Sequence, residues 1–174
     1  MIFSEANKLL EPGYTALETG FCRLSNGQTM VAVLTRMNRC CSHMVDWWFG
    51  HLDGSEKYRQ WYPEAHLTLE WDNSWKPGRY VGASHILENK IGGIISKSSV
   101  HFHHPTDFLD GLNLENHHKE TAICANVYDL DKVPKGKIIH YVRDTAFGCE
   151  MRSRYWLYKN FNDSAMWIMQ HCME

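Results

Sequence analysis

Six apolar runs follow one another between residues 67 and 158, and this succession limits the folds open to the chain more than any other feature. Each run is rich in β-branched or aromatic residues and is bounded by Gly, Pro, Asn or Asp, the pattern typical of strands. We predict strands over Leu67–Trp71, Tyr80–Leu87, Ile94–Phe102, Ala122–Tyr128, Lys137–Arg143 and Met151–Tyr158. Because the helical patterns lie elsewhere in the sequence, the fold class is α+β with an antiparallel sheet, not a parallel α/β fold.

The flanking segments predict a hairpin and three short helices. Phe21–Leu24 and Thr29–Arg36 alternate apolar and polar residues around Asn26-Gly27, the strongest short-range hairpin signal. We predict helices over His43–Gly50, Glu56–Trp61 and Ala165–Cys172. Residues 1–17 are expected to form an N-terminal arm ahead of the remaining domain, 18–174.

An antiparallel sheet of this size curls, and a helix can close its concave face. The expected architecture is therefore a helix-grip cup: a curved antiparallel sheet, two short helices and a C-terminal helix. That last helix has only about three turns before the chain stops at Glu174, so we expect a truncated, shortened form of the cup.

The composition indicates a small globular protein and excludes several classes of partner. The 174 residues suit a single domain, 1-174, and 44% of them are hydrophobic, enough to build a core. The formal net charge is −2 and the basic residues are scattered, so we expect no nucleic acid partner. The longest apolar runs, such as Met30–Leu34, are too short to cross a membrane, and the first residues show no secretory signal. A cytoplasmic protein is therefore expected.

Aromatic and polar residues alternate densely between Asp46 and His66, beginning with Asp46-Trp47-Trp48-Phe49-Gly50-His51. Aromatic side chains mixed with a few convergent polar groups are typical of a small-molecule pocket. The alternative is an amphipathic helix whose tryptophans only pack against the sheet.

Two histidines and two acids from separate segments could form a metal site. His66 opens a predicted strand, Glu88 ends the next, and His171 lies on the last helix with Glu174 three residues later. Such a set would bind zinc through nitrogen and oxygen and leave a position for water. The six cysteines include no Cys-x-x-Cys pair, so a thiolate zinc finger is excluded. The alternative for each residue alone is a surface or hydrogen-bonded polar group.

His140 and Tyr155 fall on consecutive predicted strands, which would pair as neighbours. The alternation along the last strand places Met151, Ser153 and Tyr155 on one face. An imidazole and a phenol facing a cavity can exchange protons with a phenolic substrate. Tyr155 could equally be an ordinary strand aromatic.

Several blocks, in this order, resemble the 2,4-diacetylphloroglucinol hydrolase family, which includes phloretin hydrolase. The blocks are Asp46-Trp47-Trp48-Phe49-Gly50, Tyr58 to Pro63-Glu64-Ala65-His66, Glu88 with Ile91-Gly92-Gly93, Arg143-Asp144-Thr145 and Gly148-Cys149-Glu150-Met151-Arg152-Ser153-Arg154-Tyr155-Trp156. The resemblance implies a START-like helix-grip fold and zinc-dependent cleavage of the carbon–carbon bond between an acyl group and a phloroglucinol ring.

By position, the resemblance implies that His66, Glu88 and His171 bind Zn2+, with Asn89 adjacent to the strand carboxylate. The family's fourth ligand, a glutamate four residues after the helix histidine, would fall one residue beyond Glu174. Glu174 or the terminal carboxylate would have to replace it.

The resemblance further implies that Tyr58, His140 and Tyr155 hold and protonate a small phenolic ketone, which would release a carboxylic acid. The rival is a non-catalytic helix-grip protein that binds a small aromatic or lipid ligand. The short last helix favours this rival, and the retained polar residues disfavour it. A homo-oligomer is a further expectation, since a second subunit could cover the apolar surface that a short helix leaves.

Overall fold

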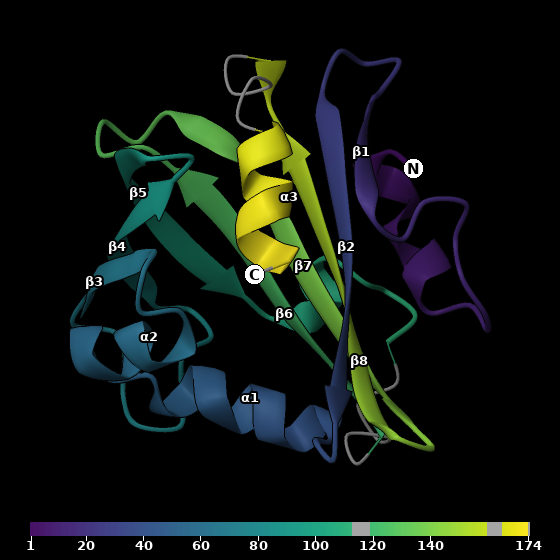
Figure 1. Ribbon diagram of the computed structural model, residues 1–174, viewed down its shortest axis with the longest axis horizontal. Helices are drawn as coiled ribbons and strands as arrows, with labels where there is room; N and C mark the ends of the chain where they lie inside the picture. The colour runs from purple at the N-terminus through teal and green to yellow at the C-terminus, as the bar shows by residue number, and fades with distance from the viewer. Residues whose placement is uncertain (113–118, 160–164, 174) are drawn as a thin grey trace.

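The computed structural model describes residues 1–112, 119–159 and 165–173, and its framework is one eight-stranded antiparallel sheet (Figure 1). The strand order is β1-β2-β8-β7-β6-β5-β4-β3. The strands are β1 (Gly20–Arg23), β2 (Thr29–Asn38), β3 (His66–Trp71), β4 (Ser84–Ile91), β5 (Ile94–His103), β6 (Glu120–Tyr128), β7 (Pro134–Thr145) and β8 (Gly148–Leu157). The α+β class and the antiparallel sheet predicted from the sequence are confirmed.

In the described part of the chain, three α-helices accompany the sheet: α1 (Ser42–His51), α2 (Ser55–Trp61) and α3 (Ala165–Met173). Two 3₁₀ segments, η1 (Phe3–Leu9) and η2 (Pro105–Asp107), lie outside it. α1 and α2 carry the chain from β2 to β3, at the far edge of the sheet. Each following strand then pairs with its predecessor until β8 returns to β2. None of the described helices is long and apolar enough to span a membrane.

The sheet is strongly curved, and α3 lies in its concave face. α3 packs against both β2 and β4, although β8, β7, β6 and β5 lie between these two strands in the sheet. A flat sheet would hold the two strands too far apart for one helix to touch both, since adjacent strands are about 4.8 Å apart. Figure 1 shows α3 in front of the sheet and α1 with α2 along its lower end. The expected helix-grip cup is therefore present.

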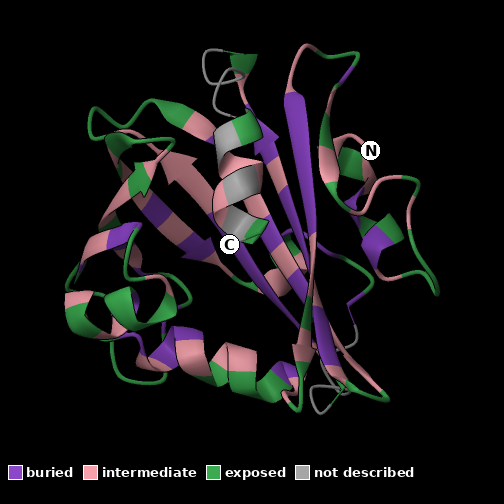
Figure 2. Cartoon of the chain, in the orientation of Figure 1, coloured by how far each residue is buried: buried purple, intermediate pink, exposed green. Residues whose placement is uncertain are grey.

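The convex face is covered by the N-terminal segment. Leu9 of η1 packs in one cluster with Leu109 and with Trp156 of β8, and all three are fully buried. Figure 2 shows buried residues concentrated along β2 and β8. Covering the convex face in this way leaves the concave face to the helices and to a cavity.

The largest difference from the predicted strands is at β4, which begins at Ser84 rather than Tyr80. Gly78 and Gly82 on either side of Tyr80 have positive φ values of 77° and 84°, so the backbone turns there. Tyr80 is held in this turn because its hydroxyl donates to Asp46 Oδ1 on α1 at 2.6 Å. The ring of Tyr80 therefore packs this turn against α1 and is not part of a strand.

Candidate active site

A cavity of about 550 Å³ lies between the concave face of the sheet and the three helices. Its wall is mostly aromatic and aliphatic, with a small number of polar side chains from β2, β3, β4, β5, β7, β8, α2 and α3. This size and this mixture are those of small-molecule sites in proteins. The polar residues used below are Tyr58, His66, His85, Asn89, Ser98, Lys135, His140, Ser153, Tyr155 and His171, all of which line the cavity.

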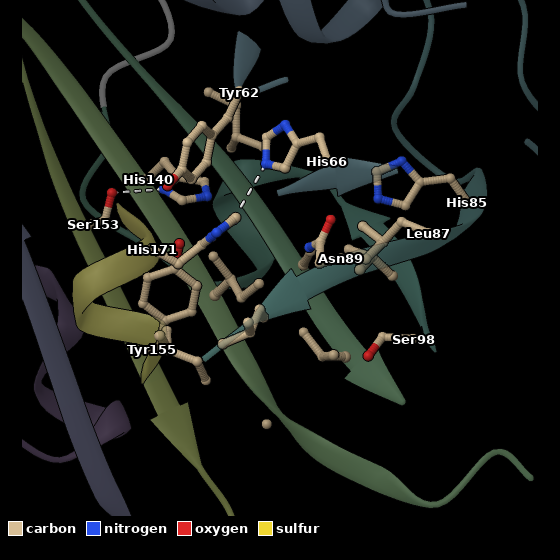
Figure 3. Close-up of a pocket in the computed structure, with 18 of the residues that line it drawn as sticks. Tyr62, His66, His85, Leu87, Asn89, Ser98, His140, Ser153, Tyr155 and His171 are labelled. Atoms are coloured by element: carbon tan, nitrogen blue, oxygen red, sulfur yellow. Dashed lines mark hydrogen bonds between the residues drawn. The ribbon is translucent and has the colours of Figure 1, made fainter. Parts of the chain in front are cut away.

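His66 and His171 both line the cavity and face one another, with their Nε2 atoms 3.2 Å apart (Figure 3). His66 comes from the first residue of β3 and His171 from α3. The Nδ1–H of His66 can donate to the backbone oxygen of Tyr58, at 3.1 Å, and the two rings stack with centroids 4.0 Å apart. The ring of His66 is thus fixed on two sides, with Nε2 turned to His171.

A local irregularity of β3 directs His66 inward. The pairing of β3 with β4 shifts register between His66 and Thr68, as at a β-bulge. Both His66 and Leu69 are buried. They are three positions apart, so regular alternation would place them on opposite faces of the strand. The bulge therefore lets the strand bury Leu69 beneath α2 while His66 reaches the cavity.

Burial keeps the His66 ring neutral. Desolvation lowers its pKa from 6.5 to about 4, against the opposing effect of the Tyr58 hydrogen bond, and the nearby His171 lowers it further. A neutral imidazole that donates from Nδ1 carries its lone pair on Nε2, which is how histidines bind metals. Two nitrogen ligands of one tetrahedral zinc, each about 2.0–2.1 Å from it, lie about 3.3 Å apart. The observed separation fits such a pair.

Asn89, not Glu88, reaches the cavity from β4. His85, Leu87, Asn89 and Ile91 line it, as the alternation of a strand requires. The hydroxyl of Tyr58 donates to the side-chain oxygen of Asn89, and Asn89 is the register partner of His66. An amide thus takes the place where the sequence suggested a carboxylate.

Glu88 points to the other face of β4. Its carboxylate lies 2.8 Å from Lys97 Nζ and accepts a hydrogen bond from Thr68 Oγ1 at 3.0 Å. The hydrogen bond from Lys97 and that from Thr68 lower the pKa of Glu88. This placement corrects the expectation that Glu88 binds the metal, because the face of β4 that lines the cavity is the one that carries Asn89.

The other predicted acid ligand, Glu174, lies outside the described residues. Within the described ranges, no group of three or more His, Cys, Asp or Glu side chains is placed to hold a metal ion. That part of the chain therefore supplies two imidazoles, His66 and His171, and no carboxylate beside them.

His140 and Tyr155 line the same cavity from β7 and β8, with ring centroids 5.7 Å apart. Nδ1 of His140 lies 2.7 Å from the hydroxyl of Ser153, its register partner on β8 (Figure 3). Burial lowers the pKa of His140 to about 4, so this ring is also neutral near pH 7. The structure thus brings together all three residues predicted to contact a phenolic substrate, since Tyr58 lines the cavity as well.

Ser153 lines the cavity, as its predicted place on the same strand face as Tyr155 indicates. His85 and Tyr62 also line the cavity and were missed in the sequence; the ring of Tyr62 lies 5.4 Å from that of His171. Strand alternation could have found His85, four positions before Asn89. Tyr62 lies in the irregular segment after α2, so no periodicity points to it.

A curved antiparallel sheet gripping a helix, with facing histidines in its cavity, defines a helix-grip protein of the α+β class. Sequence comparison gives the family: a model described as the DAPG hydrolase PhiG domain matches residues 1–172, and the chain belongs to that family.

Two related proteins carry the name 2,4-diacetylphloroglucinol hydrolase. The one from Pseudomonas sp is 25% identical over 167 residues, which cover 88% of this chain and 56% of that protein. The one from Pseudomonas protegens is 25% identical over 167 residues, covering 88% of this chain and 54% of its own length. The chain therefore spans about half the length of the curated relatives it matches.

Solved structures support the fold alone. Protein Ms6760 from Mycobacterium smegmatis superposes with a TM-score of 0.52 at 9% identity, over 88% of this chain and 90% of that one. A protein from Arthrobacter aurescens gives a TM-score of 0.50 at 9% identity, over 90% and 86% of the two chains.

Proposed function

We propose that the cavity is the active site of a hydrolase that cleaves the carbon–carbon bond between an acyl group and a phloroglucinol-type ring. The observation that carries the proposal is the Nε2–Nε2 approach of His66 and His171 at 3.2 Å, in a cavity also lined by His140 and Tyr155. Two imidazoles whose Nε2 atoms face one another at this distance suit a shared metal ion. Family membership supports an acylphloroglucinol as substrate.

His66 and His171 would hold a zinc ion in this proposal. The donor hydrogen bond of His66 Nδ1 to the Tyr58 carbonyl is the outer contact that fixes a metal-binding histidine in the correct tautomer. A bound zinc would polarise a ketone and lower the pKa of a water molecule toward about 7. The remaining ligands would come from solvent, the substrate or residues outside the described ranges.

The reaction adds water across the acyl–ring bond. The carbonyl carbon gains the oxygen of water and becomes a carboxylic acid, while the ring carbon that loses the acyl group gains a proton. Tyr155, His140 or both supply that proton, since the phenol and the neutral imidazole lie on one wall. When Nδ1 of His140 accepts a hydrogen bond from the Ser153 hydroxyl, the proton of the neutral His140 ring is on Nε2. Tyr58 assists by holding the substrate on the side of Asn89.

The test is release of acetate from 2,4-diacetylphloroglucinol by the zinc-supplemented chain. Tyr155→Phe removes the phenolic proton and should lower kcat by about a hundredfold or more. Tyr128→Phe makes the same change on β6, at a residue that does not line the cavity, and should leave kcat unchanged. A folded, zinc-loaded chain that releases no acetate would overturn the proposal.

A second candidate is a protein that binds small aromatic ligands without turnover. The observation in its favour is the mostly aromatic and aliphatic wall of the cavity. Under this reading an acylphloroglucinol binds the chain and is recovered intact after prolonged incubation with zinc. Acetate release above the Tyr155→Phe background would exclude it.

A further inference from the structure

His85 is a buried imidazole in the cavity wall that the proposed reaction does not use. It lies on β4, on the same face as Leu87 and Asn89, and only 4% of it is exposed. Its ring packs against both Trp71 and Phe102, with centroids 4.8 Å and 5.0 Å away. These two aromatic contacts hold the ring in place.

One nitrogen of this ring, Nδ1, is buried without a hydrogen-bond partner in the described part of the chain. A buried polar atom without a partner is costly, and native proteins rarely keep one without a reason. Burial also lowers the pKa of His85 to about 3, so the ring is neutral and can both donate and accept. The side chain is thus prepared to bind a polar group that the protein itself does not supply.

His85 lies in a different part of the cavity from the paired histidines. Four residues separate it from Asn89, the register partner of His66, which corresponds to about 13 Å along the strand. In Figure 3 His85 and Ser98 lie on the side of the cavity away from His140. Ser98 is the register partner of Leu87 and accepts a hydrogen bond from Lys135 Nζ at 3.2 Å. This side of the cavity therefore also carries polar side chains, His85 on β4 and Ser98 on β5.

We propose that His85 is a specificity-determining residue that binds the ring hydroxyl farthest from the acyl group of an acylphenol substrate. The inference rests on the proposed function, which places the acyl group beside His66 and His171. A hydroxyl both donates and accepts, so it satisfies either tautomer of the neutral ring. A site built to bind a hydroxyl discriminates strongly against the analogue that lacks it, since the buried partner is then left unsatisfied.

The test compares two ligands that differ only in that hydroxyl: 2,4,6-trihydroxyacetophenone and 2,6-dihydroxyacetophenone. Titration calorimetry with the zinc-supplemented chain should show about tenfold tighter binding of the trihydroxy compound. His85→Phe keeps a ring of similar size without nitrogens and should reduce the ratio of the two affinities to about one. If the phenyl ring of His85→Phe disturbs folding, His85→Leu serves instead and should also reduce the ratio to about one. His85→Asn keeps a polar side chain and should restore part of the preference.

His101→Phe provides the matched control, because His101 lies on β5 outside the cavity lining and bonds Ser84 instead. It should leave the ratio of affinities unchanged. A wild-type chain without preference, or a preference that survives His85→Phe and His85→Leu, would overturn the inference. So would failure of both ligands to bind.

Turnover measured on the same samples separates this inference from the proposed function. Discrimination that depends on His85, without acetate release, would reject the hydrolase and keep the role of His85. Acetate release with a ratio of affinities independent of His85 would keep the hydrolase and reject that role.

Discussion

The carboxylate of Glu18, in the N-terminal segment, lies 2.7 Å from the guanidinium of Arg154 on β8, 136 residues further along the chain. It also lies 2.7 Å from Arg152 Nη2, and neither arginine is exposed to solvent. Burial acts to raise the pKa of Glu18, but hydrogen bonds from Arg152 and Arg154 lower it to about 2. One carboxylate thus fastens the N-terminal segment to the convex face of the sheet.

Removing this carboxylate should destabilise the fold. Glu18→Gln leaves two buried guanidinium groups without their anion, and the free energy of unfolding should fall by about 3 kcal/mol. Urea denaturation followed by tryptophan fluorescence measures it. Glu5→Gln removes an exposed carboxylate paired with Lys8 and should have no measurable effect. Equal stability of the two variants would contradict the assigned role of Glu18.

Stability should fall with acidification because His140 is buried as a neutral ring. Its pKa is about 4 in the folded chain and 6.5 in a model peptide, so the unfolded chain binds more protons between these values. The contribution is complete above about pH 6.5 and is lost as pH falls toward about 4, at about 1.4 kcal/mol per pH unit for one proton.

Urea denaturation between pH 4.5 and pH 7 tests this slope. His140→Phe should lower the slope by about 1.4 kcal/mol per pH unit and leave the part that the buried His66 and His85 contribute. Glu18→Gln should shift the curve without changing its slope there, because the Glu18 carboxylate has a pKa of about 2, lowered from 4.5, and its contribution is lost only below that range. A His140→Phe curve parallel to that of the wild type would contradict the assignment.

The two adjacent residues of β4 should behave oppositely on substitution. Glu88→Gln changes a side chain bound to Lys97 outside the cavity, so kcat/KM for 2,4-diacetylphloroglucinol should be unchanged. Asn89→Leu removes the acceptor of the Tyr58 hydroxyl at similar volume and should lower kcat/KM by about tenfold. Steady-state kinetics decides, and a large loss in Glu88→Gln with none in Asn89→Leu would show that the assigned face of β4 is wrong.

Tyr58 makes two kinds of contact that one substitution can separate. Tyr58→Phe removes the hydroxyl that bonds Asn89 but keeps the ring stacked on His66 and the carbonyl that orients it. Zinc content should therefore remain that of the wild type, while kcat falls by about tenfold. If the variant instead lost its zinc, the hydroxyl would be acting on the metal site and not on the substrate.

Much of the fold is predictable from local patterns, because strands and hairpins leave local signals. The Asn26-Gly27 turn joins β1 and β2 as expected, and Gly27 has the positive φ of 81° that such a turn needs. β5 starts at Ile94, the predicted residue. Tyr80 misled because its ring is buried by tertiary contacts with Phe49 of α1 and Phe102 of β5, which the local sequence does not encode.

The candidate site was predictable only in part, because alternation defines two faces of a strand without saying which one is inside. His66, His140, Tyr155 and His171 lie on the cavity as expected, whereas Glu88 and Asn89 exchange places. No local pattern in the sequence identifies Lys97 as the partner of Glu88. The two residues lie opposite each other only because of the register between β4 and β5. The partnerless Nδ1 of His85 could not be foreseen either, since it depends on the packing of Trp71 and Phe102.

The central claim is that His66 and His171 hold one metal ion between their facing Nε2 atoms. The most direct measurement is the zinc content of the purified 174-residue chain after dialysis without chelator, by mass spectrometry. The account predicts about one zinc per chain in the wild type and in His103→Ala, and none in His66→Ala or His171→Ala. A folded wild-type chain without zinc, or full zinc content in both His66→Ala and His171→Ala, would contradict it.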